Sequence, residues 1–179
     1  MILMKRAQRL LLATTLLNAT GMAVADDQIV EAGFVDNAGA SIGSATLTQG
    51  PHGVLVRIEL DGLPPGSKAI HLHRTGTCHD HSAGFTASGG HVNPDGVPHG
   101  LLNPDGPGAG DFPNFYVHDN GYAWAEFFNA RVSLDGSTGE DLLDEDGSAL
   151  VIHEGPDDHM SQPIGGAGAR IACAVVGEG

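Results

Sequence analysis

Short stretches in which apolar and polar residues alternate recur along this chain of 179 residues, and they constrain its fold more than any other feature. Side chains two apart on a strand point to the same face, so alternation is typical of a half-buried strand. Each stretch is short and rich in Val, Ile, Phe or Ala, and we expect strands at residues 29–35, 43–47, 54–60, 69–73, 123–134, 149–153 and 170–176. After residue 25, no segment long enough to form a helix has apolar residues at helical spacing.

Turn-forming residues separate these stretches, with Asp, Asn, Pro and Gly gathered at 36–39, 50–53, 61–66, 119–121 and 135–136. Many short strands joined by such turns predict an all-β sandwich or barrel of antiparallel strands. Two segments, 74–118 and 154–169, break the rhythm and are dense in Gly, Pro, His and Asp. Loops of this length inside a compact domain are uncommon unless they carry function, so we expect functional residues there.

The first 25 residues have the layout of a cleaved secretory signal. Three basic residues come first, a leucine-rich stretch follows at 10–17, and Ala-Val-Ala closes the segment at 23–25. A membrane anchor is the alternative, but the apolar run is too short to span a bilayer and a small-x-small cleavage site follows it. We therefore expect a signal at 1–25 and one domain at 26–179, exported to the periplasm or secreted.

The exported part is strongly acidic. Without the leader the chain has five basic residues against 22 acidic ones, a net charge of −17. Such a surface repels nucleic acid and anionic membrane, so we expect no nucleic-acid partner and no membrane insertion after cleavage. An anionic substrate would need a local positive charge to overcome this field.

Both cysteines, Cys78 and Cys173, lie in the exported part. An oxidising compartment favours one disulfide between them. Two free buried thiols are the alternative. A metal-binding role is less consistent with the sequence, because neither cysteine has a second one within a few residues.

Histidines mark the candidate chemistry of the chain. His71 and His73 close a predicted strand and point to one face of it, so both imidazoles can reach one ion. Neutral imidazole is the commonest protein ligand of copper and zinc. A His-x-His pair alone is weak evidence, and two outward polar residues would explain it equally well.

The order of several further motifs resembles the secreted bacterial branch of the copper/zinc superoxide dismutase family, over almost the whole exported chain. The motifs are Ile70-His71-Leu72-His73, Thr75-Gly76-Thr77-Cys78, Ser88-Gly89-Gly90-His91-Val92-Asn93-Pro94, His99-Gly100, Gly110-Asp111, Val151-Ile152-His153 and Gly165-Gly166-Ala167-Gly168-Ala169-Arg170-Ile171-Ala172-Cys173. The resemblance implies a Greek-key β-sandwich of about eight antiparallel strands, and the family is a known sandwich fold. This agrees with the strand pattern.

The resemblance also implies the site residues and the reaction. The copper ligands would be His71, His73, His91 and His153, and His91 would bridge to a zinc ion that His99 and Asp111 also bind. Asp157 would link a copper histidine to a zinc histidine. Arg170 would attract and orient superoxide beside copper, and Cys78 and Cys173 would form the family disulfide. The implied activity is conversion of superoxide to oxygen and hydrogen peroxide by redox cycling of copper, with His91 carrying a proton.

One zinc ligand is missing from this pattern. The family has a histidine three residues before the aspartate, whereas this chain has Gly108 before Asp111. Structural zinc takes four ligands, so the zinc site could be empty, could use water, or could recruit another residue from the same loop. The candidates for that recruitment are His79, His81, His118 and Asp105. His52 and His159 match no family ligand and are expected to be solvated.

The glycine at 108 keeps a second function open, that of an exported copper-binding or copper-buffering protein on the same fold without enzymatic activity. The loop after His153 contains no lysine, so Arg170 would be the main charge that attracts superoxide. Family members occur as monomers and as homodimers, and either state is compatible with the sequence.

Overall fold

A computed structural model describes residues 28–177, so the predicted signal segment lies outside the described residues. The described part is almost entirely β-structure, with two short 3-10 turns, η1 (His81–Ala83) and η2 (Thr86–Ser88). The strands are β1 (Ile29–Asp36), β2 (Ser41–Gly50), β3 (Gly53–Leu60), β4 (Gly66–Lys68), β5 (Ile70–His73), β6 (Phe115–Val117), β7 (Ala123–Asn129), β8 (Val132–Ser133), β9 (Glu140–Asp141), β10 (Ser148–His153) and β11 (Arg170–Val176).

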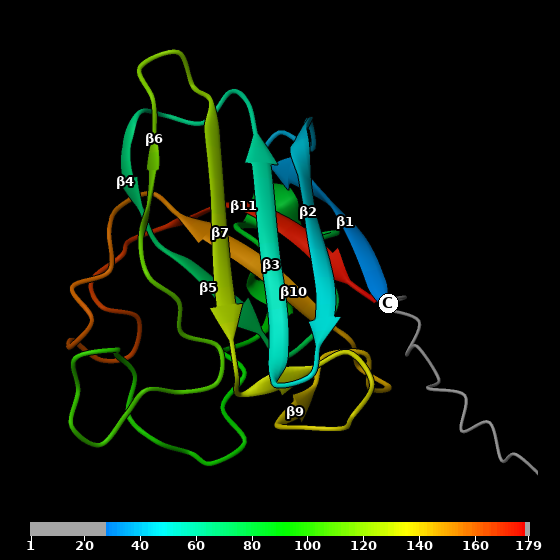
Figure 1. Ribbon diagram of the computed structural model, residues 1–179. Helices are drawn as coiled ribbons and strands as arrows, with labels where there is room; N and C mark the ends of the chain where they lie inside the picture. The colour runs from blue at the N-terminus through cyan, green and yellow to red at the C-terminus, as the bar shows by residue number, and fades with distance from the viewer. Residues whose placement is uncertain (1–27, 178–179) are drawn as a thin grey trace, which may run out of the picture.

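Seven of these strands form one antiparallel sheet in the order β5-β10-β11-β1-β2-β3-β7. Figure 1 shows that this sheet curls, so that β5, β10 and β11 pass behind β2, β3 and β7. The curl lets the two halves face each other across a common core, which is the arrangement of a β-sandwich. The predicted all-β sandwich class is therefore confirmed.

The core lies between the two halves of the curled sheet. Fully buried side chains from both halves fill it, including Phe34 of β1, Leu47 of β2, Ile58 of β3 and Ile152 of β10. Every residue of β10 is buried, because its second face is covered by the loop that carries Phe85 and Cys78. A disulfide joins Cys78 to Cys173 of β11, with Cα atoms 5.8 Å apart, and confirms the predicted pairing.

Two strand predictions differ from the structure. The expected strand 123–134 is two strands, β7 and β8, because the Asn129 side chain accepts a hydrogen bond from the Arg131 amide and turns the chain between them. The predicted loop 74–118 contains β6, which pairs with β4. The short β8 and β9 pair in parallel, an exception to the expected antiparallel pattern.

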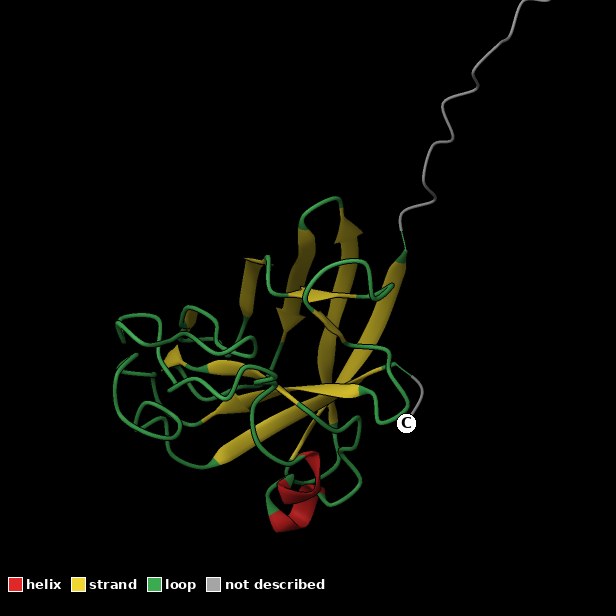
Figure 2. Cartoon of the chain, turned by 90° about the horizontal axis from the view of Figure 1, so that it is seen from below, coloured by secondary structure: helices red, strands yellow, loops and turns green. Residues whose placement is uncertain are grey.

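The long loops gather at one end of the sheet. Figure 2 shows the two 3-10 turns standing apart from the strands at the tip of the first long loop. Among residues 28–177 no helix is long and apolar enough to cross a membrane.

Candidate metal centre

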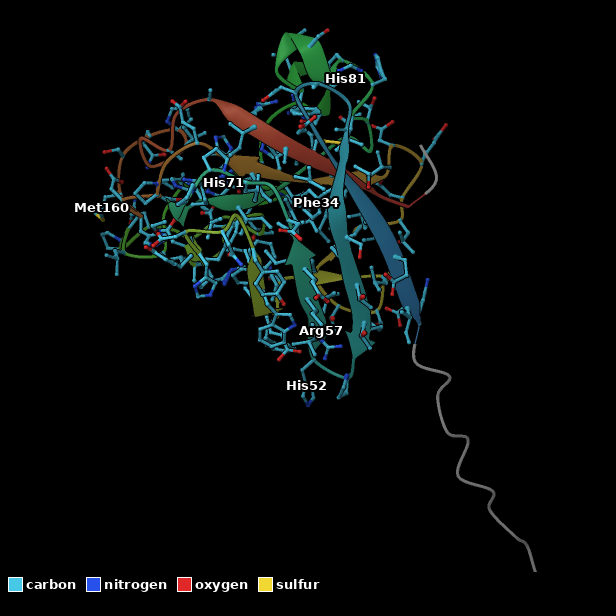
Figure 3. The ribbon with its side chains drawn as sticks, turned by 90° about the horizontal axis from the view of Figure 1, so that it is seen from above. Phe34, His52, Arg57, His71, His81 and Met160 are labelled. Atoms are coloured by element: carbon cyan, nitrogen blue, oxygen red, sulfur yellow. A yellow bond between two sulfur atoms is a disulfide. The ribbon has the colours of Figure 1, made fainter. Side chains whose placement is uncertain are left out.

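Strand alternation places the first two histidines on the same side of β5. Ile70 and Leu72 point into the core cluster, so His71 and His73 point to the opposite face. Both histidines are fully buried because loops cover that face. Figure 3 shows His71 well inside the fold, whereas His52 lies on an exposed turn, as expected.

The first long loop returns twice to the edge of β5 and brings two further ligands there. His91 forms an isolated bridge with His73, and Asp111 forms one with His71. On the second return, Gly110 packs directly on the strand, since a Cβ at this position would lie 2.4 Å from the Leu72 carbonyl oxygen. The close approach of backbone to backbone therefore requires glycine at 110.

Four histidines, His71, His73, His91 and His153, each offer a ligand nitrogen within 4.8 Å of the others. In each of them one ring nitrogen is buried without a hydrogen-bond partner in the described part of the chain: Nδ1 of His71 and Nε2 of the other three. A buried polar atom without a partner is costly, and a metal ion is the partner that four converging imidazoles fit. An all-imidazole set suits copper.

The opposite ring nitrogens of His73 and His153 bond to backbone carbonyls and hold these two imidazoles in place. His73 Nδ1 donates to the Gly89 carbonyl at 2.9 Å, and His153 Nδ1 donates to the Gly168 carbonyl at 3.0 Å. Burial lowers the pKa of His71 to about 3, of His73 to about 2 and of His153 to about 4. These rings are therefore neutral at pH 7 and oriented for a metal.

His91, His99 and Asp111 form a second group that could hold a metal ion. His91 Nδ1 and His99 Nδ1 lie 3.1 and 2.7 Å from the same oxygen, Asp111 Oδ1. Burial opposes protonation of His99, but hydrogen bonds to Asp111 and Asp157 outweigh it and raise its pKa to about 9. This donor set fits zinc with three ligands and provides no fourth.

Asp157 connects the two groups. It accepts a hydrogen bond from His71 Nε2 at 2.8 Å on Oδ2 and one from His99 Nε2 at 3.1 Å on Oδ1. Burial works against ionisation of Asp157, but the hydrogen bonds from His71 and His99 hold its pKa well below the usual range. A single carboxylate thus orients one ring on each side of the centre.

None of the four candidates for the missing zinc ligand joins this group within residues 28–177. His79 bonds to the Thr77 hydroxyl, and His81 lies against the Asn37 carbonyl. His118 lies between two tyrosine rings, and Asp105 is exposed. The structure therefore leaves the position of Gly108 without a protein side chain that replaces the histidine.

Arg170 begins β11 and lines a cavity of about 280 Å³ together with His91. Its guanidinium donates to the Phe85 and Gly89 carbonyls, both at 2.7 Å. Since both carbonyls belong to the loop tied down by the disulfide, the first long loop holds the arginine at the cavity wall. The head group is held there as a fixed positive charge.

Sequence reasoning assigned no role to two residues that support the centre. The buried Ser88 hydroxyl donates to the Phe85 carbonyl at 2.8 Å, accepts from Arg170 at 3.2 Å and lies 3.3 Å from His73 Nδ1. Asn114 exchanges two hydrogen bonds of 2.8 Å with the Asp157 backbone. The signal for Ser88 was its place beside the Gly89-Gly90-His91 motif, whereas nothing near Asn114 in the sequence points to Asp157.

His159 differs from the expected solvated histidine. It is partly buried, with its Nε2 3.3 Å from the Asn114 amide and its Nδ1 3.6 Å from Asp157. The reason is the hydrogen bond of its backbone amide to Asp157 Oδ1, which folds the ring over the carboxylate.

A family model described as copper/zinc superoxide dismutase (SODC) matches residues 41–176. The chain belongs to the copper/zinc superoxide dismutase family. A copper/zinc superoxide dismutase from Caulobacter vibrioides is 49% identical over 140 residues, which cover 77% of this chain and 79% of that protein. One from Aquifex aeolicus is 44% identical over 151 residues, covering 84% and 87%.

Solved structures agree with this family membership. The crystal structure of a superoxide-dismutase-like protein from Bacillus subtilis has a TM-score of 0.77 at 34% identity, covering 82% of this chain and 97% of that one. The copper/zinc superoxide dismutase from Brucella abortus has a TM-score of 0.66 at 23% identity, which supports the fold.

Proposed function

We propose that this protein is a superoxide dismutase that converts two superoxide ions and two protons into one molecule of oxygen and one of hydrogen peroxide. The observation that carries the proposal is the set of four buried, unpartnered imidazole nitrogens of His71, His73, His91 and His153 beside the cavity of Arg170. These nitrogens would hold copper, because they converge and have no hydrogen-bond partner among the described residues. Family membership supports the same activity.

The residues of the site would have separate roles, in binding and in positioning. Copper, when bound, supplies the one-electron oxidation and reduction of superoxide. Arg170 provides the positive charge that attracts the anion in an otherwise acidic chain, and the Phe85 and Gly89 carbonyls aim it. No lysine in the loop 154–169 shares this task.

His91 is the residue that would deliver a proton. Its Nε2 belongs to the copper group and its Nδ1 lies 3.1 Å from Asp111 Oδ1 in the other group. His91 would carry this proton on Nε2, the nitrogen that would otherwise bind copper, while the hydrogen bond between Nδ1 and Asp111 orients the ring.

We also propose that zinc binds weakly at His91, His99 and Asp111, because Gly108 removes one of the four donors of a closed site. The leader-like residues 1–25 and the disulfide support export to the periplasm or secretion, into an oxidising compartment. We infer a monomer or a homodimer, which light scattering distinguishes.

The test is metal analysis and a superoxide assay on copper-loaded protein, compared with Arg170→Ala. We expect the wild type to be active and the variant to lose about tenfold or more in rate with its copper content unchanged, because arginine is not a ligand. Protein with copper fully bound and no activity would overturn the proposal. Equal loss of copper and activity in the variant would contradict the role of Arg170.

Gly108 is the one observation that favours a second function, copper buffering without catalysis. Without a firmly held zinc, His91 could serve as an ordinary copper ligand. Gly108→His separates the two, because a Cβ at 108 meets only ordinary contacts of 3.5 Å with Asn93. A large gain in turnover after zinc loading would indicate that the natural site is impaired and favour buffering; unchanged high turnover supports the enzyme.

A further inference from the structure

The position of Gly108 opens into a cavity that also reaches Arg170. One cavity of about 280 Å³ has Gly108, Asn93, His99, Asp111 and Arg170 among its lining residues. Gly108 has an ordinary backbone conformation, and the nearest atoms to a Cβ there belong to Asn93, at 3.5 Å. The neighbouring atoms therefore leave room in which a fourth donor to the zinc group can lie.

Asp111 does not supply that fourth donor with its second oxygen. Oδ2 accepts the Gly100 amide at 2.9 Å and the Gly108 amide at 3.0 Å, whereas Oδ1 faces His91 and His99. The carboxylate is thereby fixed as a single-oxygen ligand. A zinc ion on these residues would have three protein donors, which is the pattern of a site that exchanges its fourth ligand with solvent.

Charge decides which kind of ligand suits the remaining position. With His91 bonded to both metals through Nε2 and Nδ1, its ring is an imidazolate. The imidazolate and the Asp111 carboxylate together offset two of the four charges of a Cu²⁺–Zn²⁺ pair and leave two net positive charges. Apart from the ligands themselves, Arg170 is the charged residue in the described lining of the cavity, and it is also positive. The net positive charge of the metal pair and the charge of Arg170 both favour an anion.

We propose that the Gly108 cavity is a binding site for a small anion that completes the coordination of zinc in place of the missing histidine. The site rests on the proposed binding of zinc by His91, His99 and Asp111. A fourth side-chain ligand would close the zinc site. With glycine at 108, the fourth position of zinc would instead be open to the cavity that Arg170 also lines.

The test uses the whole protein with Co²⁺ in the zinc position and Ag⁺ in the copper position, since Ag⁺ has no visible d–d absorption. Azide is the anion probe. We expect azide to shift the visible Co²⁺ bands of the wild type in a saturable manner. Gly108→His should lose this response, with azide binding at least about tenfold weaker, because an imidazole fills the fourth position.

Gly108→Ala is the matched control, because it adds a Cβ but no donor, and it should keep the azide response. If Co²⁺ gives no tetrahedral spectrum with the wild type, the proposed zinc site is wrong and the anion site falls with it. If Co²⁺ binds and azide leaves the bands unchanged, the zinc site stands and the anion site is overturned. An equal azide response in wild type and Gly108→His also overturns it, since the anion would then bind elsewhere.

Discussion

The two groups that would bind copper and zinc, called here the copper half and the zinc half, are held by different parts of the molecule. The copper half takes three of its four candidate ligands, His71, His73 and His153, from adjacent strands of the main sheet, and these three rings are neutral at pH 7. The zinc half takes its candidate ligands His91, His99 and Asp111 from one long loop. The pKa of His99 is raised to about 9 by its hydrogen bonds to Asp111 and Asp157, so this ring holds a proton at neutral pH. Four imidazole nitrogens converge in the copper half, whereas the zinc half has three donor residues in the described part of the chain, because Gly108 has no side-chain donor.

The largest expected effect comes from removing one ligand on each side. His153→Ala should lower copper affinity and activity by more than about 100-fold, because it breaks the four-nitrogen set. His99→Ala should lower activity much less, because its site is already short of a donor. Copper and zinc content with superoxide turnover measures both, and equal losses in the two variants would break the comparison.

Asp157→Asn should affect both halves at once, by about 10- to 100-fold in metal affinity. Asp157 bonds His71 on the copper side and His99 on the zinc side, both in the protein interior. Competition titrations with chelators measure each affinity separately. Asp158→Asn is the matched control: its carboxylate caps the loop backbone at Met160 and Ser161, so metal affinity should stay within about twofold.

The number of protons released on metal binding should differ between the zinc half and the copper half. His99 has a pKa raised to about 9, so at pH 7 a metal ion must displace a proton from it. Below pH 9 protons compete with zinc, and the apparent zinc affinity should therefore fall with decreasing pH, by up to about tenfold per pH unit. Calorimetry in buffers of different ionisation enthalpy should find about one proton released per zinc at pH 7.

The pH dependence of copper binding is the internal control for the zinc measurement. His71, His73 and His153 have pKa values lowered to between about 2 and 4, so these rings are already neutral from pH 5 upward. Copper affinity should change less than zinc affinity between pH 6 and 8. A flat zinc affinity over that range contradicts the protonated state of His99.

The smallest effect is expected from Ser88→Ala, which tests how the copper half and Arg170 are joined. Ser88 accepts a hydrogen bond from Arg170 and lies beside His73, so its loss should weaken azide binding to the copper-loaded protein by about fivefold, the value of one hydrogen bond. Copper content should stay unchanged. Thr86→Ala is the control, because its hydroxyl bonds Asp80 instead of Arg170; equal weakening in both variants would point to a disturbed loop.

Local pattern in the sequence was enough to predict much of the sheet. Alternation in β3 and β5 places apolar side chains on one face, and that pattern survives in any fold that buries one side of a strand. The prediction failed where a single side-chain contact decided the chain path. Asn129 ends β7 by capping the Arg131 amide, and the hydrophobic pattern runs through that turn without a break.

The ligand types and the gap at Gly108 were determined by the sequence. A histidine or aspartate side chain has a metal-binding atom in any fold, and glycine has none. Which ring nitrogen faces the metal was decided by the tertiary structure. The Gly89 and Gly168 carbonyls and the Asp157 carboxylate occupy the opposite nitrogens of His73, His153 and His71. These partners are between 15 and 86 residues away in the chain, so only folding brings them to the rings and turns four histidines into one site.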